Sequence, residues 1–329
     1  MSGKVYDFDL SLTILRCVFD RMPRALWRER EIPEEIVTIV QEDRRVRSLL
    51  GLFGLLKFAE VPMMRSAGLL LNRLIDFWEP DALAFRVQGE RVDLTLTDVY
   101  FLTGLPCLGR VADTQPRVAA DFDIDDVRER LCRADAEVHR NALLVRDFRE
   151  PAVRAMAACV VQILGSQSPE KVSGGQMQLV ERVLAGTYFA WGQMFLTCVQ
   201  RQLTAAKESG KGFCYGSFLC AFFMERVPTL RPRVPVRARG LREPRMIRWG
   251  EMMRRRGGGD VGRYFTQELY MQWLQLPLAL EDYPYRDMDF TGDPDAPRPP
   301  GQAWGPDGMY DLFALSIFML YDIWLICCD

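Results

Sequence analysis

Residues 69–109, LLLNRLIDFWEPDALAFRVQGERVDLTLTDVYFLTGLPCLG, contain the pattern that decides the fold. Their first part has apolar residues at helical spacing and ends at Trp78, just before Pro80, because proline cannot continue a helix. Apolar and polar residues then alternate from Phe85 to Leu96 around a Gln-Gly turn at 88–89, as they do in a β-hairpin with one buried face. The stretch therefore predicts a helix that leads into a small hairpin.

A second helix is expected directly after this hairpin. The Thr97 side chain is suited to cap a helix over 98–103, and Gly104 is suited to end it, because glycine accepts the left-handed conformation of a C-cap. Elsewhere apolar residues recur at helical spacing, and no further convincing strand pattern occurs. The expected helices cover residues 10–19, 33–40 (closed by Arg44, Arg45 and Arg47), 69–78, 121–138, 152–164, 177–198, 213–224 and 264–274. The predicted fold class is mainly α, a multi-helix globular domain with one small β-hairpin near residues 85–96.

Composition divides the chain into four parts. A stretch rich in Gly, Pro and polar residues at 106–120 marks the first boundary, and an abrupt change to arginine marks the second. The predicted organisation is an N-terminal helical part at 1–110, a helical body at 111–230, an Arg-rich segment at 231–263, and C-terminal helices with a Pro/Gly linker at 264–329. With 329 residues, 49% of them hydrophobic, the chain is long and apolar enough to form a substantial core.

The 69–109 stretch resembles the plant mobile domain, a transposon-associated family that is also called aminotransferase-like. The resemblance rests on an apolar helix ending in Trp, a proline with an acidic neighbour, a Phe-containing strand, Gly-Glu, Thr-Leu, Asp-Val, and Gly-Leu-Pro followed by Gly. In this chain these features are Trp78, Pro80, Phe85, Gly89, Glu90, Thr95, Leu96, Asp98, Val99, Gly104, Leu105, Pro106 and Gly109. The resemblance implies a helical body, a nuclear location, and a role in gene silencing, genome maintenance or the transposable element itself.

The same motif is interpreted from its chemistry as a scaffold. Trp78 and Phe85 are large apolar residues on either side of a proline, so both rings are expected to be buried. Gly89 supplies a turn and Gly104 a helix end. None of these residues suggests a nucleophile or an acid–base pair, and we therefore expect a protein that acts by binding rather than by catalysis, without a cofactor.

Several enzyme classes are excluded or disfavoured by residue counts and spacing. The chain has one histidine, His139, which excludes zinc sites that need two, and its five lysines leave few Schiff-base candidates for pyridoxal phosphate. His139 is expected at the surface or boundary of a charged helix. Lys211 lies in a Ser-Gly-Lys-Gly turn, but a phosphate-binding loop would need Gly in place of Ala205 and Ser or Thr in place of Gly212. The glycines of 257–262 follow a polar segment rather than a strand, which favours a loop over a dinucleotide-binding turn.

A short acidic run resembles the start of a calcium loop. Asp121, Asp123 and Asp125 have the required spacing, but Asp126 stands where such a loop needs glycine and Cys132 where it needs glutamate. Helix capping is the simpler interpretation. The alternative function is a transposition enzyme, or its degenerate remnant, with an acidic metal site, because 44 carboxylates allow many groupings of three. No pattern selects one group, so no catalytic, cofactor or metal residue is predicted.

The strongest candidate for a binding site is the Arg-rich segment. It contains ten arginines within 26 residues, against two glutamates, in a chain whose net charge is −2. These candidates for contact with nucleic-acid phosphates are Arg231, Arg233, Arg237, Arg239, Arg242, Arg245, Arg248, Arg254, Arg255 and Arg256. Met246 and Trp249 lie among them and are considered as groups that wedge or stack against bases. The alternative is a solvated linker whose arginines pair with the acidic remainder of the chain.

Location and partners follow from the termini and the cysteines. The N-terminal residues lack the apolar core of a signal peptide, and the nine cysteines lie mostly in apolar runs, as in a reduced, intracellular protein. Residues 312–328 are almost wholly apolar but include Asp322, which favours a buried helix over a membrane anchor. A protein partner is expected and not identified. A further interpretation is a shortened element copy, since the sequence stops within this apolar run.

Overall fold

The computed structural model describes residues 32, 34–61, 68–87, 89–119, 122–165, 168, 170–226, 244–247 and 249. Over these residues the chain is mainly helical with small antiparallel sheets, which confirms the predicted fold class. None of the described helices is long and apolar enough to cross a membrane. The helices predicted at 10–19 and 264–274, and the apolar run at 312–328, lie outside the described residues.

Three helices come first: α2 (Glu34–Glu42), α3 (Arg44–Leu52) and the short α4 (Leu56–Ala59). The prediction that the arginines at 44–47 close the first of these helices is wrong, because they open the next one. The reason is Asp43, whose carboxylate accepts hydrogen bonds from the backbone N–H of Arg45 at 2.8 Å and of Val46 at 3.3 Å. A capping carboxylate starts a new helix even where the apolar pattern continues.

The segment 68–93 forms the predicted helix and hairpin. Helix α5 (Gly68–Phe77) leads directly into β1 (Trp78–Glu79), which is followed by β2 (Ala84–Val87) and β3 (Glu90–Asp93). The sheet has the order β1-β2-β3 with antiparallel pairing, and Phe85 lies opposite both Trp78 and Val92. The hairpin is confirmed, but it ends at residue 93 instead of 96, and Trp78 begins a third strand rather than ending a helix.

Helix α6 (Leu96–Thr103) starts earlier than predicted, and its N-cap is Thr95 rather than Thr97. The Thr95 hydroxyl accepts from the Asp98 N–H at 3.3 Å, while the Asp98 carboxylate accepts from the Thr95 N–H at 2.8 Å. This reciprocal capping box takes the end of the predicted hairpin out of the sheet. Gly104 ends the helix as predicted, with a φ of 74°.

Residues 122–173 contain a second sheet that the sequence pattern does not predict. Asp123 caps α7 (Ile124–Leu131), as expected, but the helix ends seven residues before the predicted 138 and leaves His139 in a loop. A tight turn at Arg140-Asn141, with φ of 50° and 61°, then leads into β4 (Ala142–Leu144). Strand β4 pairs with β5 (Lys171–Ser173) and is followed by a short 3-10 helix (Val145–Asp147). Strands of three residues are too short to show a detectable alternation.

The remaining described helices are α8 (Pro151–Leu164), α9 (Gly174–Leu184), α10 (Trp191–Ser209) and α11 (Gly216–Glu225). The prediction of a single helix at 177–198 is wrong, because the helix is interrupted between α9 and α10. Gly186 has a φ of 89° there, and Phe189 pairs with Arg110 in an isolated β-bridge. The apolar residues on both sides of the break keep helical spacing, and the helix is interrupted by a glycine in a left-handed conformation together with this long-range pairing.

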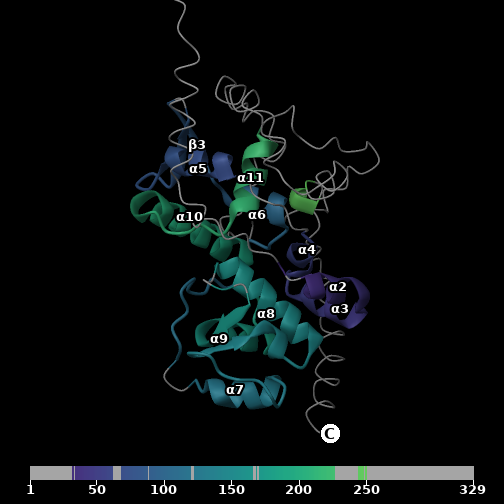
Figure 1. Ribbon diagram of the computed structural model, residues 1–329. Helices are drawn as coiled ribbons and strands as arrows, with labels where there is room; N and C mark the ends of the chain where they lie inside the picture. The colour runs from purple at the N-terminus through teal and green to yellow at the C-terminus, as the bar shows by residue number, and fades with distance from the viewer. Residues whose placement is uncertain are drawn as a thin grey trace, which may run out of the picture.

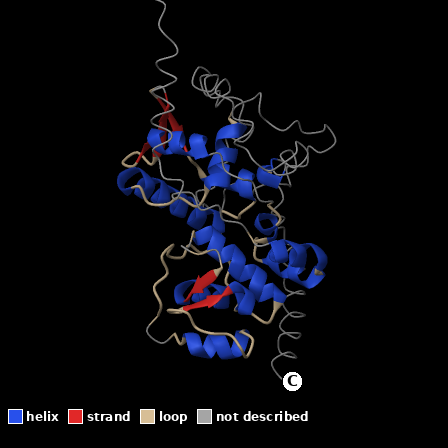
Figure 2. Cartoon of the chain, in the orientation of Figure 1, coloured by secondary structure: helices blue, strands red, loops and turns tan. Residues whose placement is uncertain are grey.

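Helix α8 lies at the centre of the molecule (Figure 1). It contacts α2 and α3 on one side and α9 and α10 on others, and the residues from Ala155 to Val161 are all buried. Figure 2 shows the two sheets far apart, one beside α5 and the other beside α9. The Trp191 indole donates to the Phe53 carbonyl at 3.1 Å, which ties the start of α10 to the end of α3. One hydrophobic core therefore connects the N-terminal part with the helical body.

Candidate functional site

The aromatic members of the motif form a buried stack. Trp78 is 1% exposed and Phe85 is 2% exposed, which confirms that both rings are buried. Their ring centroids lie 5.0 Å apart in an edge-on arrangement, and Phe85 lies 5.5 Å from Phe222 of α11. The Trp78 Nε1 donates to the Thr204 hydroxyl of α10 at 3.1 Å. The motif thus joins the N-terminal sheet to helices that are more than a hundred residues away in the chain.

The acidic member of the motif forms a buried ion pair. Asp98 Oδ1 lies 2.7 Å from Nη2 of Arg226, at the end of α11, and the two side chains are 1% and 6% exposed. The Arg226 guanidinium also lies 3.7 Å from the centroid of the Phe222 ring, and its Nη1 donates to the Phe222 carbonyl at 3.2 Å. The same carboxylate caps α6 through Thr95. Asp98 is therefore fully engaged in holding the fold.

Two glycines of the motif allow close approach of other segments. A Cβ at Gly104 would lie 2.7 Å from Cγ of Pro244 and 2.8 Å from Cβ of Lys57, and one at Gly109, where φ is 131°, would lie 2.8 Å from the backbone of Phe189. Real Cβ contacts are longer, so only glycine fits at both places. Of the other members, Val99 and Leu105 are buried, Gly89 turns the hairpin with a φ of 88°, and Pro80, Glu90, Leu96 and Pro106 lie in or beside the connections.

A second buried carboxylate, Glu225, was not predicted as a site residue. Arg245 Nε and Nη2 donate to its Oε1 and Oε2 at 2.8 and 3.0 Å, and the Trp249 Nε1 donates to Oε1 at 2.8 Å. Glu225 is 3% exposed and Trp249 is 1% exposed. The available signal was the pair Glu225-Arg226 at the end of a wholly apolar run, because charges in such a position need buried partners.

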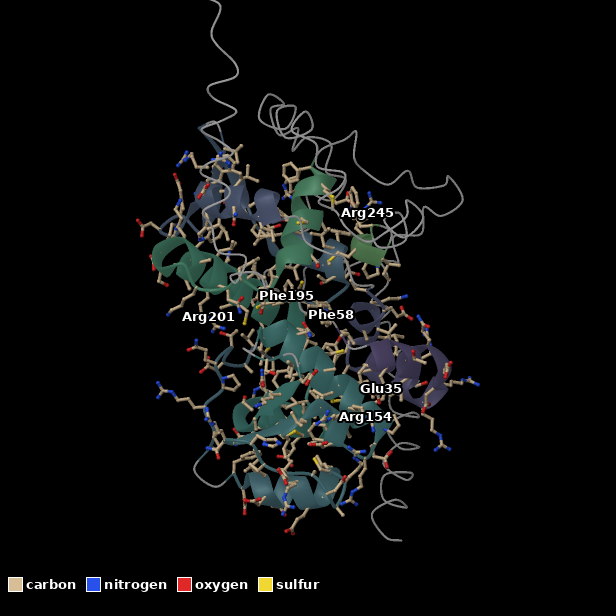
Figure 3. The ribbon with its side chains drawn as sticks, in the orientation of Figure 1. Glu35, Phe58, Arg154, Phe195, Arg201 and Arg245 are labelled. Atoms are coloured by element: carbon tan, nitrogen blue, oxygen red, sulfur yellow. The ribbon has the colours of Figure 1, made fainter. Side chains whose placement is uncertain are left out.

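Three residues of the Arg-rich segment, Arg245, Met246 and Trp249, are held within the protein itself. Arg245 is held by Glu225, and Figure 3 shows it beside α11. The interpretation of Met246 and Trp249 as groups that stack or wedge against nucleic acid is wrong, because both are buried in the protein core. Indole and thioether groups gain more from packing in the core than from exposure. The other nine arginines of the segment lie outside the described residues.

The remaining candidate residues do not converge on a site. His139 is partly exposed in the turn before β4, where its backbone N–H and C=O bond to Ala142, so its predicted place on a helix is wrong. Lys211 follows the Gly210 C-cap of α10 and is exposed. Within the described part of the chain, no three His, Cys, Asp or Glu side chains are placed to hold a metal ion. Asp121 lies outside that part.

Burial raises the pKa of one thiol and two phenols near the motif. Desolvation raises the pKa of Cys107 from 9.0 to about 12. Desolvation, together with the nearby Cys107, raises the pKa of Tyr100 to about 12. Desolvation, together with the nearby Tyr100 and Cys107, raises the pKa of Tyr188 to about 12. All three groups therefore stay protonated at neutral pH, and Cys107 lacks the thiolate that a nucleophile needs.

Comparison with known proteins adds no relative to this description. No protein-family model, curated protein or solved structure matches the chain. The resemblance to the plant mobile domain therefore stays a prediction that rests on the residues of the 69–109 stretch.

Proposed function

We propose that this chain is a non-enzymatic, transposable-element-derived protein of the plant mobile domain type, which acts in the nucleus by binding protein or nucleic acid. The observation that supports the proposal is how the polar members of the motif are used. Thr95 and Asp98 bond to each other, and Asp98 also pairs with the buried Arg226. A carboxylate committed to a buried ion pair and a helix cap holds the fold and is not placed for acid–base chemistry.

The proposed contact with nucleic acid lies in the Arg-rich segment. Its density of arginine is the feature of the sequence best suited to phosphate, since each guanidinium can bind two phosphate oxygens. Arg245 is excluded from this role by its pairing with Glu225. If about five of the other nine arginines reach phosphates, the logarithm of affinity falls with the logarithm of salt concentration with a slope of roughly −4 to −5. Binding is expected to depend little on base sequence, because phosphate contacts carry no sequence information.

Fluorescence anisotropy with two unrelated labelled duplexes at several salt concentrations tests this proposal. The variant reverses two charges, Arg254→Glu and Arg255→Glu, and the matched control reverses two exposed arginines of α3, Arg44→Glu and Arg45→Glu. We expect the first pair of substitutions to reduce the magnitude of the salt slope by about two, which corresponds to about two lost phosphate contacts. The control should leave the slope nearly unchanged. Absence of binding at low salt, or equal effects of the two variants, would return these arginines to the linker interpretation.

Catalysis is tested separately on the same purified protein. We expect no cleavage of supercoiled or linear DNA in the presence of Mg²⁺ or Mn²⁺. Metal-dependent cleavage that one Asp or Glu substitution abolishes would overturn the proposal in favour of the transposition enzyme.

A further inference from the structure

One stretch of the helical body contains no carboxylate. From Arg182 to Lys207 the sequence contains no aspartate or glutamate, although the whole chain has 44 acidic residues among 329. This stretch forms the end of α9, the turn that follows, and most of α10. Gln193 and Thr197 are exposed on α10, so the first half of its solvent side carries uncharged polar groups.

The loop at 110–119 borders this surface, starting at the turn between α9 and α10. The Arg110 N–H donates to the Tyr188 carbonyl at 2.9 Å, and the Arg110 carbonyl accepts from the Ala190 N–H at 3.1 Å. The Arg182 guanidinium lies 5.2 Å from the centroid of the Phe189 ring, within the same turn. The backbone of Arg110 and the guanidinium of Arg182 therefore both lie at this turn, although one residue precedes α9 and the other belongs to it.

Further along, the loop reaches both helices. The Thr114 hydroxyl accepts from Nη1 of Arg201, on α10, at 3.0 Å, and the Ala119 N–H donates to Oε1 of Gln178, on α9, at 3.2 Å. Arg117 lies between these two anchor points and is exposed. Figure 3 shows Arg201 on the side of the molecule away from Arg245, so this surface is separate from the Glu225 cluster.

We name the four cations Arg110, Arg117, Arg182 and Arg201 the basic strip. None of them forms an ion pair with a carboxylate of the described residues. Two acidic residues are close in sequence: the Asp113 carboxylate accepts from the Gln115 N–H at 2.9 Å, and Glu181 pairs with Arg130 at 2.6 Å. Most other described arginines lie beside an acidic partner, whereas the four cations of the strip face one exposed carboxylate, Asp113, and keep a net positive charge.

We propose that the basic strip binds the phosphate backbone of a nucleic acid. Arginines spread over a loop and two helices can contact successive phosphates, and the exposed Gln193 amide can donate a hydrogen bond to a phosphate or sugar oxygen. An anionic membrane is the less favoured occupant, because a membrane-surface helix needs an apolar face beside its cations, whereas the exposed side of α10 is polar. The inference rests on the proposed function for the class of ligand, but it uses residues outside the Arg-rich segment.

The test uses the full chain and the same labelled duplexes. Arg110→Gln with Arg117→Gln removes two exposed charges of the strip, and Arg44→Gln with Arg45→Gln is the matched control on α3. We expect the strip variant to reduce the magnitude of the salt slope by about two, and the control to reduce it by less than about 0.5. Far-UV circular dichroism of both variants should equal that of the parent chain, because all four side chains are exposed.

The outcomes separate this inference from the proposed function. If the Arg254→Glu, Arg255→Glu variant flattens the salt dependence while the strip variant behaves like its control, the strip inference is overturned and the proposed function stands. If only the strip variant flattens it, the strip is supported and the contact through the Arg-rich segment fails. Binding to phosphatidylserine vesicles without binding to DNA overturns the choice of nucleic acid, and absence of any DNA binding at low salt overturns both.

Discussion

The Asp98–Arg226 ion pair is expected to be a costly polar contact to break within the described part of the chain. The charged atoms lie 2.7 Å apart, and the side chains are 1% and 6% exposed. Replacing Asp98 with alanine removes the carboxylate that faces the Arg226 guanidinium and leaves that charge in the core, which costs about 3–5 kcal/mol. The same substitution removes one half of the capping box of α6, which adds about 0.5–2 kcal/mol. We therefore expect a total loss of about 3.5–7 kcal/mol of unfolding free energy.

Equilibrium unfolding in urea, followed by circular dichroism and by tryptophan fluorescence, measures this loss. Thr95→Ala is the control that weakens the cap but keeps the ion pair, and it should cost only about 1 kcal/mol. Arg226→Met completes a double-mutant cycle. The loss of unfolding free energy in the double variant should be smaller than the sum of the two single losses by about 2 kcal/mol or more. The reasoning is refuted if Asp98→Ala costs no more than Thr95→Ala, or if the two single losses simply add.

Three other predictions follow from the same structure. Trp78→Ala should destabilise the chain by about 3–5 kcal/mol in urea unfolding, because the ring is buried against Phe85, and a loss below about 1 kcal/mol would contradict this packing. Glu225→Gln removes the charge that holds Trp249, so the tryptophan emission should shift to longer wavelength, whereas an unchanged spectrum would show that the indole does not depend on the carboxylate. The Cys107 thiol has a pKa of 9.0 in the unfolded chain, and burial raises this pKa to about 12 in the folded protein. As pH rises, the unfolded state therefore loses this proton first. Stability should therefore fall as pH rises from about 9 to about 12, and Cys107→Ala should reduce this fall.

Local signals in the sequence were sufficient for the hairpin, for the burial of Trp78 and Phe85, and for the helix predicted at 152–164, which begins at Pro151. In each case the information lies within a few residues: an alternation of period two, a proline that ends or begins a helix, or a glycine at a C-cap. Local chemistry also contained the cap of α6, but Thr95 and Thr97 are both good capping residues. Thr95 is the N-cap because Asp98 lies three residues after it and completes the reciprocal capping box.

The sequence by itself thus determined that this chain is mainly helical, that it contains a hairpin whose aromatic residues enter the core, and that its basic charge is concentrated in one segment. The tertiary structure showed that α9 and α10 are separate helices, with Gly186 at positive φ and the pairing of Phe189 with Arg110 at the break. It also decided that Asp98 faces Arg226 and that Trp249 lies on Glu225. The physical reason is that helix caps and strand alternation act between neighbours in the chain, whereas a buried charge selects its partner by distance in space, and no periodic pattern records that distance.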